Sequence, residues 1–121
     1  MYDLTALTKA VQEKGIRTHV ETSGTSPLTG NWDWITFSPK KFKKPLEEYY
    51  ANAHELKVII FNKSDFKWAK GHQDLLNDDC KLLIQPEWSK RNQYSHDIID
   101  FVKDNSEWQL SLQTHKYLDI P

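Results

Sequence analysis

Apolar residues recur along this chain in two patterns, one typical of helices and one typical of strands. In residues 3–14 they fall on one helical face, and Gly15 supplies a stop signal. The apolar face consists of Leu4, Leu7, Ala10 and Val11. Residues 17–22 are rich in β-branched side chains and are followed by a Ser/Gly/Pro turn, which predicts a short strand. The amino-terminal part is therefore expected to form a helix followed by a strand.

The same two patterns predict four further strands and three further helices. The strands are expected at residues 34–38, 55–61, 81–84 and 108–112, and the helices at 45–53, 64–76 and 92–103. Pro45 can open its helix because a first turn needs no hydrogen bond from that nitrogen. The nearly continuous apolar run at 55–61 is typical of a strand covered on both faces. In the last helix, Ile98, Ile99 and Val102 are expected to point inward.

Five strands that alternate with helices predict one α/β domain covering residues 1–121. Long crossovers between strands favour parallel pairing, which brings the carboxyl ends of all strands to one edge. The sequence contains no linker, repeat or low-complexity segment that would divide it.

Composition excludes several classes of partner. Sixteen basic and seventeen acidic residues give a net charge of −1, so no broad nucleic-acid surface is expected. The basic run at residues 40–44 is interpreted as an exposed loop, with a phosphate-binding patch as the alternative. The start of the chain lacks a signal-peptide pattern, and no apolar run approaches the length of a membrane span.

The sequence contains a single cysteine, Cys80, which limits disulfide formation and metal binding. One thiol cannot form an internal disulfide, and alone it cannot hold an iron–sulfur cluster or a structural zinc. Sparse cysteine favours a reducing, cytoplasmic setting, and Cys80 itself is expected to be an inert, partly buried thiol. The histidines at 19, 54, 72 and 96 show no metal-ligand spacing.

Polar segments follow four of the predicted strands. They lie at residues 21–25, 38–40, 85–87 and 113–116. Ligands of parallel sheets bind beyond the carboxyl ends of the strands, so these segments are candidates for a site. Polarity alone does not decide the matter, because an ordinary solvated edge would also be polar.

The order of these segments resembles 7-carboxy-7-deazaguanine synthase, a family of the radical S-adenosylmethionine superfamily that acts in queuosine biosynthesis. The matching segments are His19-Val20-Glu21-Thr22-Ser23-Gly24-Thr25, Ser38-Pro39-Lys40, Glu55-Leu56-Lys57-Val58, Ile84-Gln85-Pro86 and Ser111-Leu112-Gln113-Thr114-His115-Lys116-Tyr117. The resemblance covers almost the whole chain and implies the carboxyl-terminal half of a radical S-adenosylmethionine (β/α) barrel. Family members begin with a Cys-x-x-x-Cys-x-x-Cys motif and a Gly-Gly-Glu-Pro-like segment, and this sequence contains neither.

The resemblance implies a specific reaction for the intact family. A [4Fe–4S] cluster reduces S-adenosylmethionine, and the resulting radical acts on 6-carboxy-5,6,7,8-tetrahydropterin. Ring contraction with loss of ammonia, assisted by Mg²⁺, gives 7-carboxy-7-deazaguanine. This chain cannot bind the cluster alone and is expected to be inactive by itself.

The resemblance also assigns cofactor-binding residues. Thr22, Ser23 and Gly24 are expected to face the ribose and methionine of the cofactor, although an ordinary turn of small residues would look the same. Ser38 and Lys40 offer a hydroxyl and an ammonium suited to the methionine carboxylate. Gln85 offers an amide, and its alternative is a simple turn residue.

The substrate is expected to contact four residues at the same edge. They are Glu21, Gln113, His115 and the terminal carboxylate of Pro121. A carboxylate within an otherwise apolar strand either pairs with a basic residue or faces the barrel interior, which applies to Glu21. His115 could bind the pterin carboxylate, with a purely structural role as its alternative.

The absence of the first half has a consequence for partners. Without that half, an apolar barrel edge would be exposed, which predicts a homodimer that covers it.

The resemblance leaves one alternative function open, which is a non-catalytic module that binds a pterin or a nucleoside.

Overall fold

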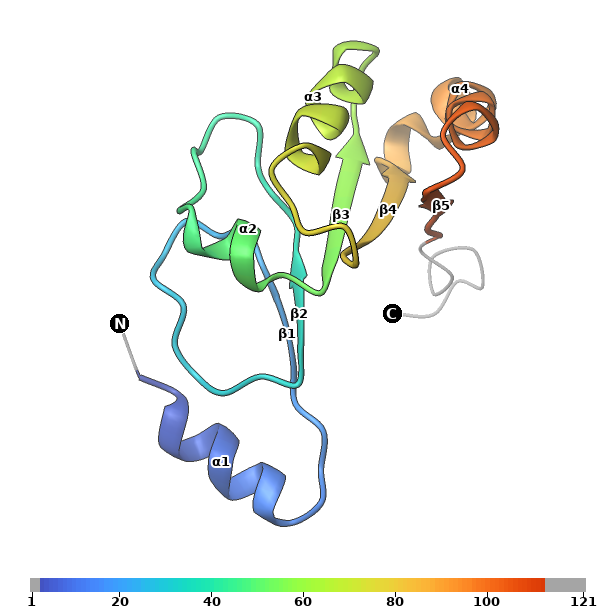
Figure 1. Cartoon of the computed structure of the whole chain (residues 1–121). Helices are drawn as coiled ribbons and strands as arrows, with labels where there is room; N and C mark the ends of the chain where they lie inside the picture. The colour runs from blue at the N-terminus through green and yellow to red at the C-terminus, as the bar shows by residue number, and fades with distance from the viewer. Residues whose placement is uncertain (1–2, 113–121) are drawn as a thin grey trace.

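The computed structural model describes residues 3–112 and contains one five-stranded parallel sheet in the order β1-β2-β3-β4-β5 (Figure 1). The strands are β1 (His19–Thr22), β2 (Trp34–Phe37), β3 (Glu55–Ile60), β4 (Lys81–Pro86) and β5 (Trp108–Leu110). The helices are α1 (Thr5–Glu13), α2 (Glu48–Asn52), α3 (Ser64–Gln73) and α4 (Arg91–Asp104), with a 3₁₀ turn at Trp88–Lys90. The predicted α/β class and the parallel pairing are confirmed.

The hydrophobic core lies between the sheet and the helices α2, α3 and α4. Leu56, Val58 and Ile60 of β3 are fully buried, and so is Ile84 of β4. Strand pairing puts Leu56, Leu82 and Trp108 in one row, so all these side chains point to the same face. Helix α3 packs on β3, and α4 packs on β4 and β5. At an order of ~2 kcal/mol for each large buried side chain, this layer is the main source of stability.

The opposite face of the sheet, here called the open face, carries the alternate residues of each strand. Its members include His19, Glu21, Trp34, Thr36, Glu55, Lys57, Ile59, Lys81, Leu83, Gln85 and Gln109. In β3 these side chains are only half-buried, so the prediction that residues 55–61 are covered on both faces is wrong. The run at residues 55–61 looks continuously apolar because Ile59, on the less covered open face, is also apolar.

The strand order is that of a barrel segment. Each strand neighbours the next one in the sequence, and the order never reverses as it does in doubly wound sheets. Helices α2, α3 and α4 lie on one face of the described sheet, which is the layout of a (β/α) barrel cut open. The chain therefore forms a partial (β/α) barrel, as the resemblance implied.

Helix α1 lies apart from the other helices, below the strands in Figure 1. Thr8 is its only buried residue, and Leu7 on its apolar face is 61% exposed. Polar contacts attach α1 to the loop before β2: the Thr8 hydroxyl accepts from the N–H of Asn31 at 2.8 Å, and the Gln12 amide donates to the Thr18 hydroxyl at 2.9 Å.

Two details differ from the sequence predictions. Helix α2 begins at Glu48, so Pro45 precedes the helix and does not open it. Residues 23–33 connect β1 to β2 without a helix, in agreement with the turn expected after residue 22. Ile99 is 43% exposed, whereas Ile98 is fully buried as expected. Among the helices of residues 3–112, none has the length and apolar character needed to cross a bilayer.

Candidate functional site at the carboxyl edge of the sheet

The carboxyl edge of the sheet brings together the predicted residues that the structure describes. The N–H of Ser38 donates to the carbonyl of Thr22 at 2.8 Å, which joins the ends of β1 and β2 directly. Strand register places Glu21 and Gln85 on the open face, near its carboxyl edge. Ser38 directly follows β2 at the same end of the sheet. The three residues therefore lie at one end of the sheet.

Gly24 follows β1 in a left-handed conformation, with φ of 76°. A Cβ atom built there would lie 2.8 Å from Cε1 of Phe37 and 3.2 Å from Cγ of Tyr49. The close approach that requires glycine is thus to two rings of the core. Its N–H donates a 3.1 Å hydrogen bond to the Thr22 hydroxyl oxygen, which fixes the turn. The predicted contact with a cofactor at this turn stays a prediction.

Ser38 and Gln85 are polar yet buried, at 5% and 3% exposure. The Gln85 side-chain oxygen accepts a hydrogen bond from the Ser111 hydroxyl at 3.1 Å. This contact orients the amide, because its oxygen is bound to Ser111, the residue that follows β5, and its NH₂ group is directed away from that residue. Lys40, two residues after Ser38, is exposed. A buried hydroxyl, an oriented amide and a solvent-facing ammonium at one edge can together bind an anionic, hydrogen-bonding ligand.

Glu21 pairs with Lys57 on the open face, with 2.7 Å between Oε1 and Nζ. The sequence left two alternatives for Glu21, a basic partner or a position facing the barrel interior. In the structure Glu21 has a basic partner and also lies on the face that points away from the helices. It is not buried, however: its side chain is 49% exposed. The ion pair leaves one side of the carboxylate accessible from the open face.

A second polar chain crosses the open face toward the amino ends of the strands. The Thr36 hydroxyl donates to Oε1 of Glu55 at 2.9 Å. Because that proton is committed, Nε2 of His19 must donate to Thr36 across their 2.8 Å contact. The open face therefore carries two groups of polar contacts, unlike the apolar face beneath the helices.

Three predicted substrate contacts, Gln113, His115 and Pro121, lie outside the described residues. Sequence analysis missed three polar partners that the structure shows, namely Lys57, Ser111 and the buried Asp65. Only strand alternation could have indicated Lys57, because Glu21 and Lys57 share a face through register rather than through sequence.

The residues present do not fit an iron–sulfur cluster. Cys80 is the sole cysteine of the sequence, and it is buried. Burial, aided by nearby Asp79 and Glu55, raises the pKa of its thiol to about 11, so it is not a ready thiolate ligand. Within residues 3–112, no three His, Cys, Asp or Glu side chains are grouped to hold a metal.

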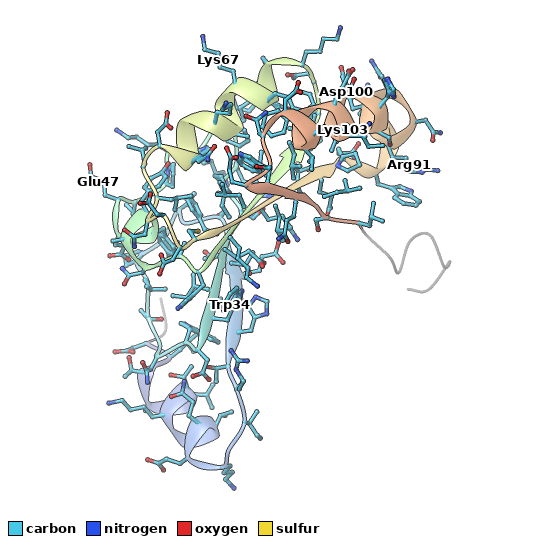
Figure 2. The ribbon with its side chains drawn as sticks, turned by 45° about the vertical axis from the view of Figure 1, so that its right-hand side comes forward. Trp34, Glu47, Lys67, Arg91, Asp100 and Lys103 are labelled. Carbon is cyan, nitrogen blue, oxygen red and sulfur yellow. The ribbon has the colours of Figure 1, made fainter. Side chains whose placement is uncertain are left out.

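A cavity of about 630 Å³ lies at the amino ends of the strands rather than at the carboxyl edge. Its walls include Trp34, His54 and Lys81, and Figure 2 shows Trp34 well below the region of α3 and α4. The rings of Trp34 and His54 stack at 5.1 Å, and Lys81 lies over the indole at 5.6 Å. These contacts satisfy the side chains among themselves, and ligands of (β/α) barrels bind at the other end. We therefore assign the site to the carboxyl edge.

The fold and this edge define the class of the protein: part of a (β/α) barrel with a polar open face. No protein-family model matches the chain. Its sequence is 48% identical over 120 residues to 7-carboxy-7-deazaguanine synthase of Flavobacterium psychrophilum and 44% identical to that of Synechocystis; each alignment covers 99% of this chain and 57% of the relative. The crystal structure of QueE from Escherichia coli superimposes with a TM-score of 0.78 at 26% identity, covering 93% of this chain and 51% of that one.

These similarities confirm the resemblance drawn from the sequence. The chain is homologous to about half of a 7-carboxy-7-deazaguanine synthase. It spans just over half the length of the curated relatives that it matches.

Proposed function

We propose that this chain supplies the carboxyl-terminal part of a 7-carboxy-7-deazaguanine synthase. In this role its carboxyl edge contacts S-adenosylmethionine and 6-carboxy-5,6,7,8-tetrahydropterin, and the cluster and Mg²⁺ are held by residues outside this chain. The grouping of Glu21, Ser38 and Gln85 at one edge is the observation that supports the proposal. The single cysteine fits a cytoplasmic setting.

Each group at this edge has a distinct task in the proposed complex. When bound, S-adenosylmethionine supplies the radical chemistry, so the protein needs only to bind, orient and exclude water. Ser38 and Lys40 bind the methionine carboxylate, and the Gln85 amide donates to a polar atom of the cofactor. Thr22, Ser23 and Gly24 line the ribose and methionine. Glu21, steadied by Lys57, accepts from N–H groups of the pterin, together with Gln113, His115 and the Pro121 carboxylate.

Reconstitution tests this proposal directly. The 121-residue chain is mixed with the part of the Flavobacterium psychrophilum relative that it does not span, and the iron–sulfur cluster is rebuilt without oxygen. The mixture is expected to form 7-carboxy-7-deazaguanine, while either part alone is expected to be inactive. Lys40→Gln should weaken turnover by about ten-fold or more through the lost ionic contact. Lys43→Gln, which removes an equal charge three residues away, is the matched control. A well-formed complex without product would contradict the proposal.

Calorimetry with the chain alone distinguishes the synthase part from the second candidate function, a non-catalytic binding module. Micromolar binding of the pterin by this chain without its complement would favour a non-catalytic binding module. Absence of binding, with activity on reconstitution, favours the synthase part.

We also propose that the chain alone forms a two-fold dimer. Strand β1 forms one edge of the described sheet, and Leu7 and Ile16 beside it are 61% and 56% exposed. A second copy would cover both the edge and these apolar side chains. Sedimentation velocity over a hundred-fold range of concentration should show the dimer; a monomer throughout would contradict it.

A further inference from the structure

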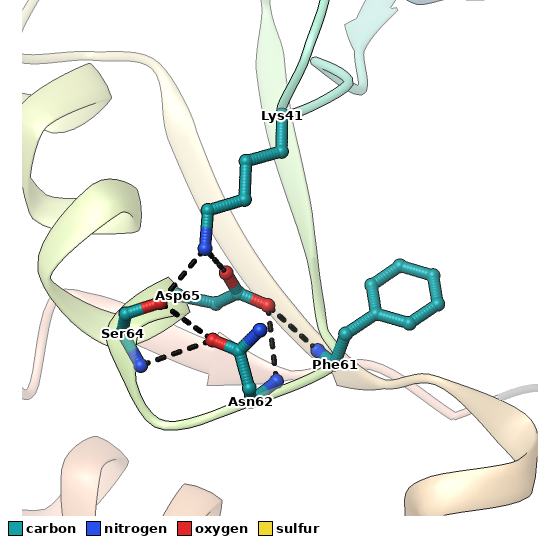
Figure 3. A network of polar contacts seen from close by, with 5 residues as sticks. All are labelled: Lys41, Phe61, Asn62, Ser64 and Asp65. Atoms are coloured by element: carbon teal, nitrogen blue, oxygen red, sulfur yellow. Dashed lines mark hydrogen bonds and ion pairs between the residues drawn. The ribbon is translucent and has the colours of Figure 1, made fainter.

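Asp65 is a buried carboxylate directly behind the carboxyl edge. It lies in the first turn of α3 and is 1% exposed. Its Oδ2 accepts hydrogen bonds from the N–H groups of Phe61 at 2.8 Å and Asn62 at 3.1 Å, which follow β3 (Figure 3). A buried charge is costly unless it is paired and hydrogen-bonded, so the placement of Asp65 depends on its remaining partner.

That partner is Lys41, which comes from a different part of the chain. Its Nζ lies 2.6 Å from Oδ1 of Asp65 and also donates to the Ser64 hydroxyl at 2.7 Å. Ser64 in turn donates to Oδ1 of Asn62 at 2.6 Å, which closes the network (Figure 3). Lys41 thus joins the loop after β2 to the start of α3.

Lys41 directly follows the Ser-Pro-Lys segment 38–40. At the start of this segment, the N–H of Ser38 donates to the carbonyl of Thr22 in β1 at 2.8 Å. On the far side, the N–H of Lys43 donates to the carbonyl of Lys40 at 3.2 Å and closes a turn. Lys40 therefore lies between two fixed points. Of the two adjacent lysines, Lys41 is committed to Asp65, while Lys40 is exposed.

We propose that Asp65 is a positioning residue for Lys40. Through Lys41 it fixes the backbone of the Ser-Pro-Lys segment, so that the Lys40 ammonium is held where the carboxylate of S-adenosylmethionine binds. This inference rests on the proposed function. It also explains why a buried carboxylate, paired with the partly exposed Lys41 side chain, is present at the start of α3.

Three single variants test the role of Asp65 in the reconstituted complex. Asp65→Asn and Lys41→Gln each break the ion pair, and Lys43→Gln removes the same charge from the same loop without touching it. The first two are expected to raise the Kd of S-adenosylmethionine by about ten-fold or more, since small misplacements of binding groups are costly. The double variant Asp65→Asn/Lys41→Gln should be no worse than either single one. Lys43→Gln should bind as the unchanged protein does.

A role in stability alone predicts a different result. If Lys41→Gln binds S-adenosylmethionine as tightly as Lys43→Gln does, the proposal is wrong, even where Lys41→Gln melts at a lower temperature. Should Asp65→Asn fail to fold, Lys41→Gln carries the test, because the Lys41 side chain is 35% exposed and its loss leaves the backbone contacts of Asp65 in place.

A second measurement does not depend on the ligand. Phe42 at the tip of the loop is 97% exposed, so chymotrypsin cleavage after it reports how firmly the loop is held. Asp65→Asn is expected to accelerate this cleavage several-fold. Absence of cofactor binding by the unchanged complex would defeat the proposed function. In that case the cleavage rates still test whether Asp65 holds the loop. Equal rates for Asp65→Asn and the unchanged chain would show that it does not, and faster cleavage of Asp65→Asn would show that it does.

Discussion

In β3 every second side chain is buried, and in β4 four of the six residues are buried, whereas β1 contains no buried side chain. Leu56, Val58, Ile60 and Ile84 are completely covered, while Leu7 of α1 and Ile16 before β1 are mostly exposed. The two regions have similar local patterns, yet only the central one has a second layer to pack against. The comparison teaches that the central strands carry most of the stability of this chain, and that its amino-terminal part has no comparable second layer among the described residues.

Leucine substitutions in the two regions should differ most. Leu56→Ala in β3 should lower the free energy of unfolding by ~2–5 kcal/mol, because it leaves a cavity in a fully packed layer. Leu7→Ala in α1 should change it by less than ~0.5 kcal/mol, because that side chain is exposed. Urea denaturation followed by tryptophan fluorescence gives both values. Equal losses would show that α1 is part of the same packed core.

Two glycines provide a second comparison, since both have positive φ angles. At Gly15, with φ of 79°, an added Cβ meets no atom within 4 Å, so Gly15→Ala should cost only the ~1–2 kcal/mol of a left-handed backbone. At Gly24 the added Cβ would also overlap Phe37, so Gly24→Ala should cost a further ~1–3 kcal/mol. Chemical denaturation of both variants measures the difference. A Gly24→Ala protein as stable as Gly15→Ala would show that the turn is free to move.

A titratable group in the central region should make stability depend on pH. His72 is buried, its Nδ1 lies 2.8 Å from the Tyr50 hydroxyl, and its Nε2 has no partner among the described residues. Burial lowers the pKa of His72 below 6.5. The folded state therefore binds fewer protons than the unfolded state, and stability is full above pH 6.5 and falls as the pH drops toward the folded-state pKa.

Unfolding experiments between pH 5 and pH 8 test this dependence. His72→Gln should reduce the loss of stability at low pH, because glutamine does not titrate. His96→Gln, at an exposed histidine on α4, is the control and should retain it. If the pH dependence of stability is unchanged in His72→Gln, the loss of stability at low pH comes from another titratable group.

The smallest effect is expected on the open face. Glu21 and Lys57 form an ion pair that is partly exposed, so solvent screens it and its contribution to stability is at most ~1 kcal/mol. A double-mutant cycle with Glu21→Gln and Lys57→Met measures the coupling. A coupling of several kcal/mol would mean that this face is covered in solution.

Sequence alone predicted the fold where periodicity was strong. The nearly continuous apolar run at residues 55–61 predicted β3, the apolar segment at 81–84 predicted β4, and the polar segments after the strands pointed to the carboxyl edge. Periodicity could not show that Ile59 lies on the less covered face, because an apolar residue looks the same on either side of a strand. Pro45 is compatible with a helix start and with the extended loop that it occupies, so local chemistry could not place α2.

The contacts that link distant segments could not be predicted. Lys41 lies in a run of lysines that resembles an ordinary solvated loop, and most of that run is indeed exposed. Its pairing with Asp65 connects residues 24 positions apart and depends on how β2 and β3 align. The Glu21–Lys57 pair depends on strand register in the same way. The resemblance supplied the site residues, but only the sheet shows which of them share a face.

Amide hydrogen exchange of β1, with and without the complementary part of the Flavobacterium psychrophilum relative, tests the central claim most directly. If β1 is an internal strand of a longer barrel, its amides should exchange much faster than those of β3 in the isolated chain. They should become protected when the complement is added. Protection of β1 equal to that of β3 in a monomeric chain, or no change on adding a bound complement, would contradict the account.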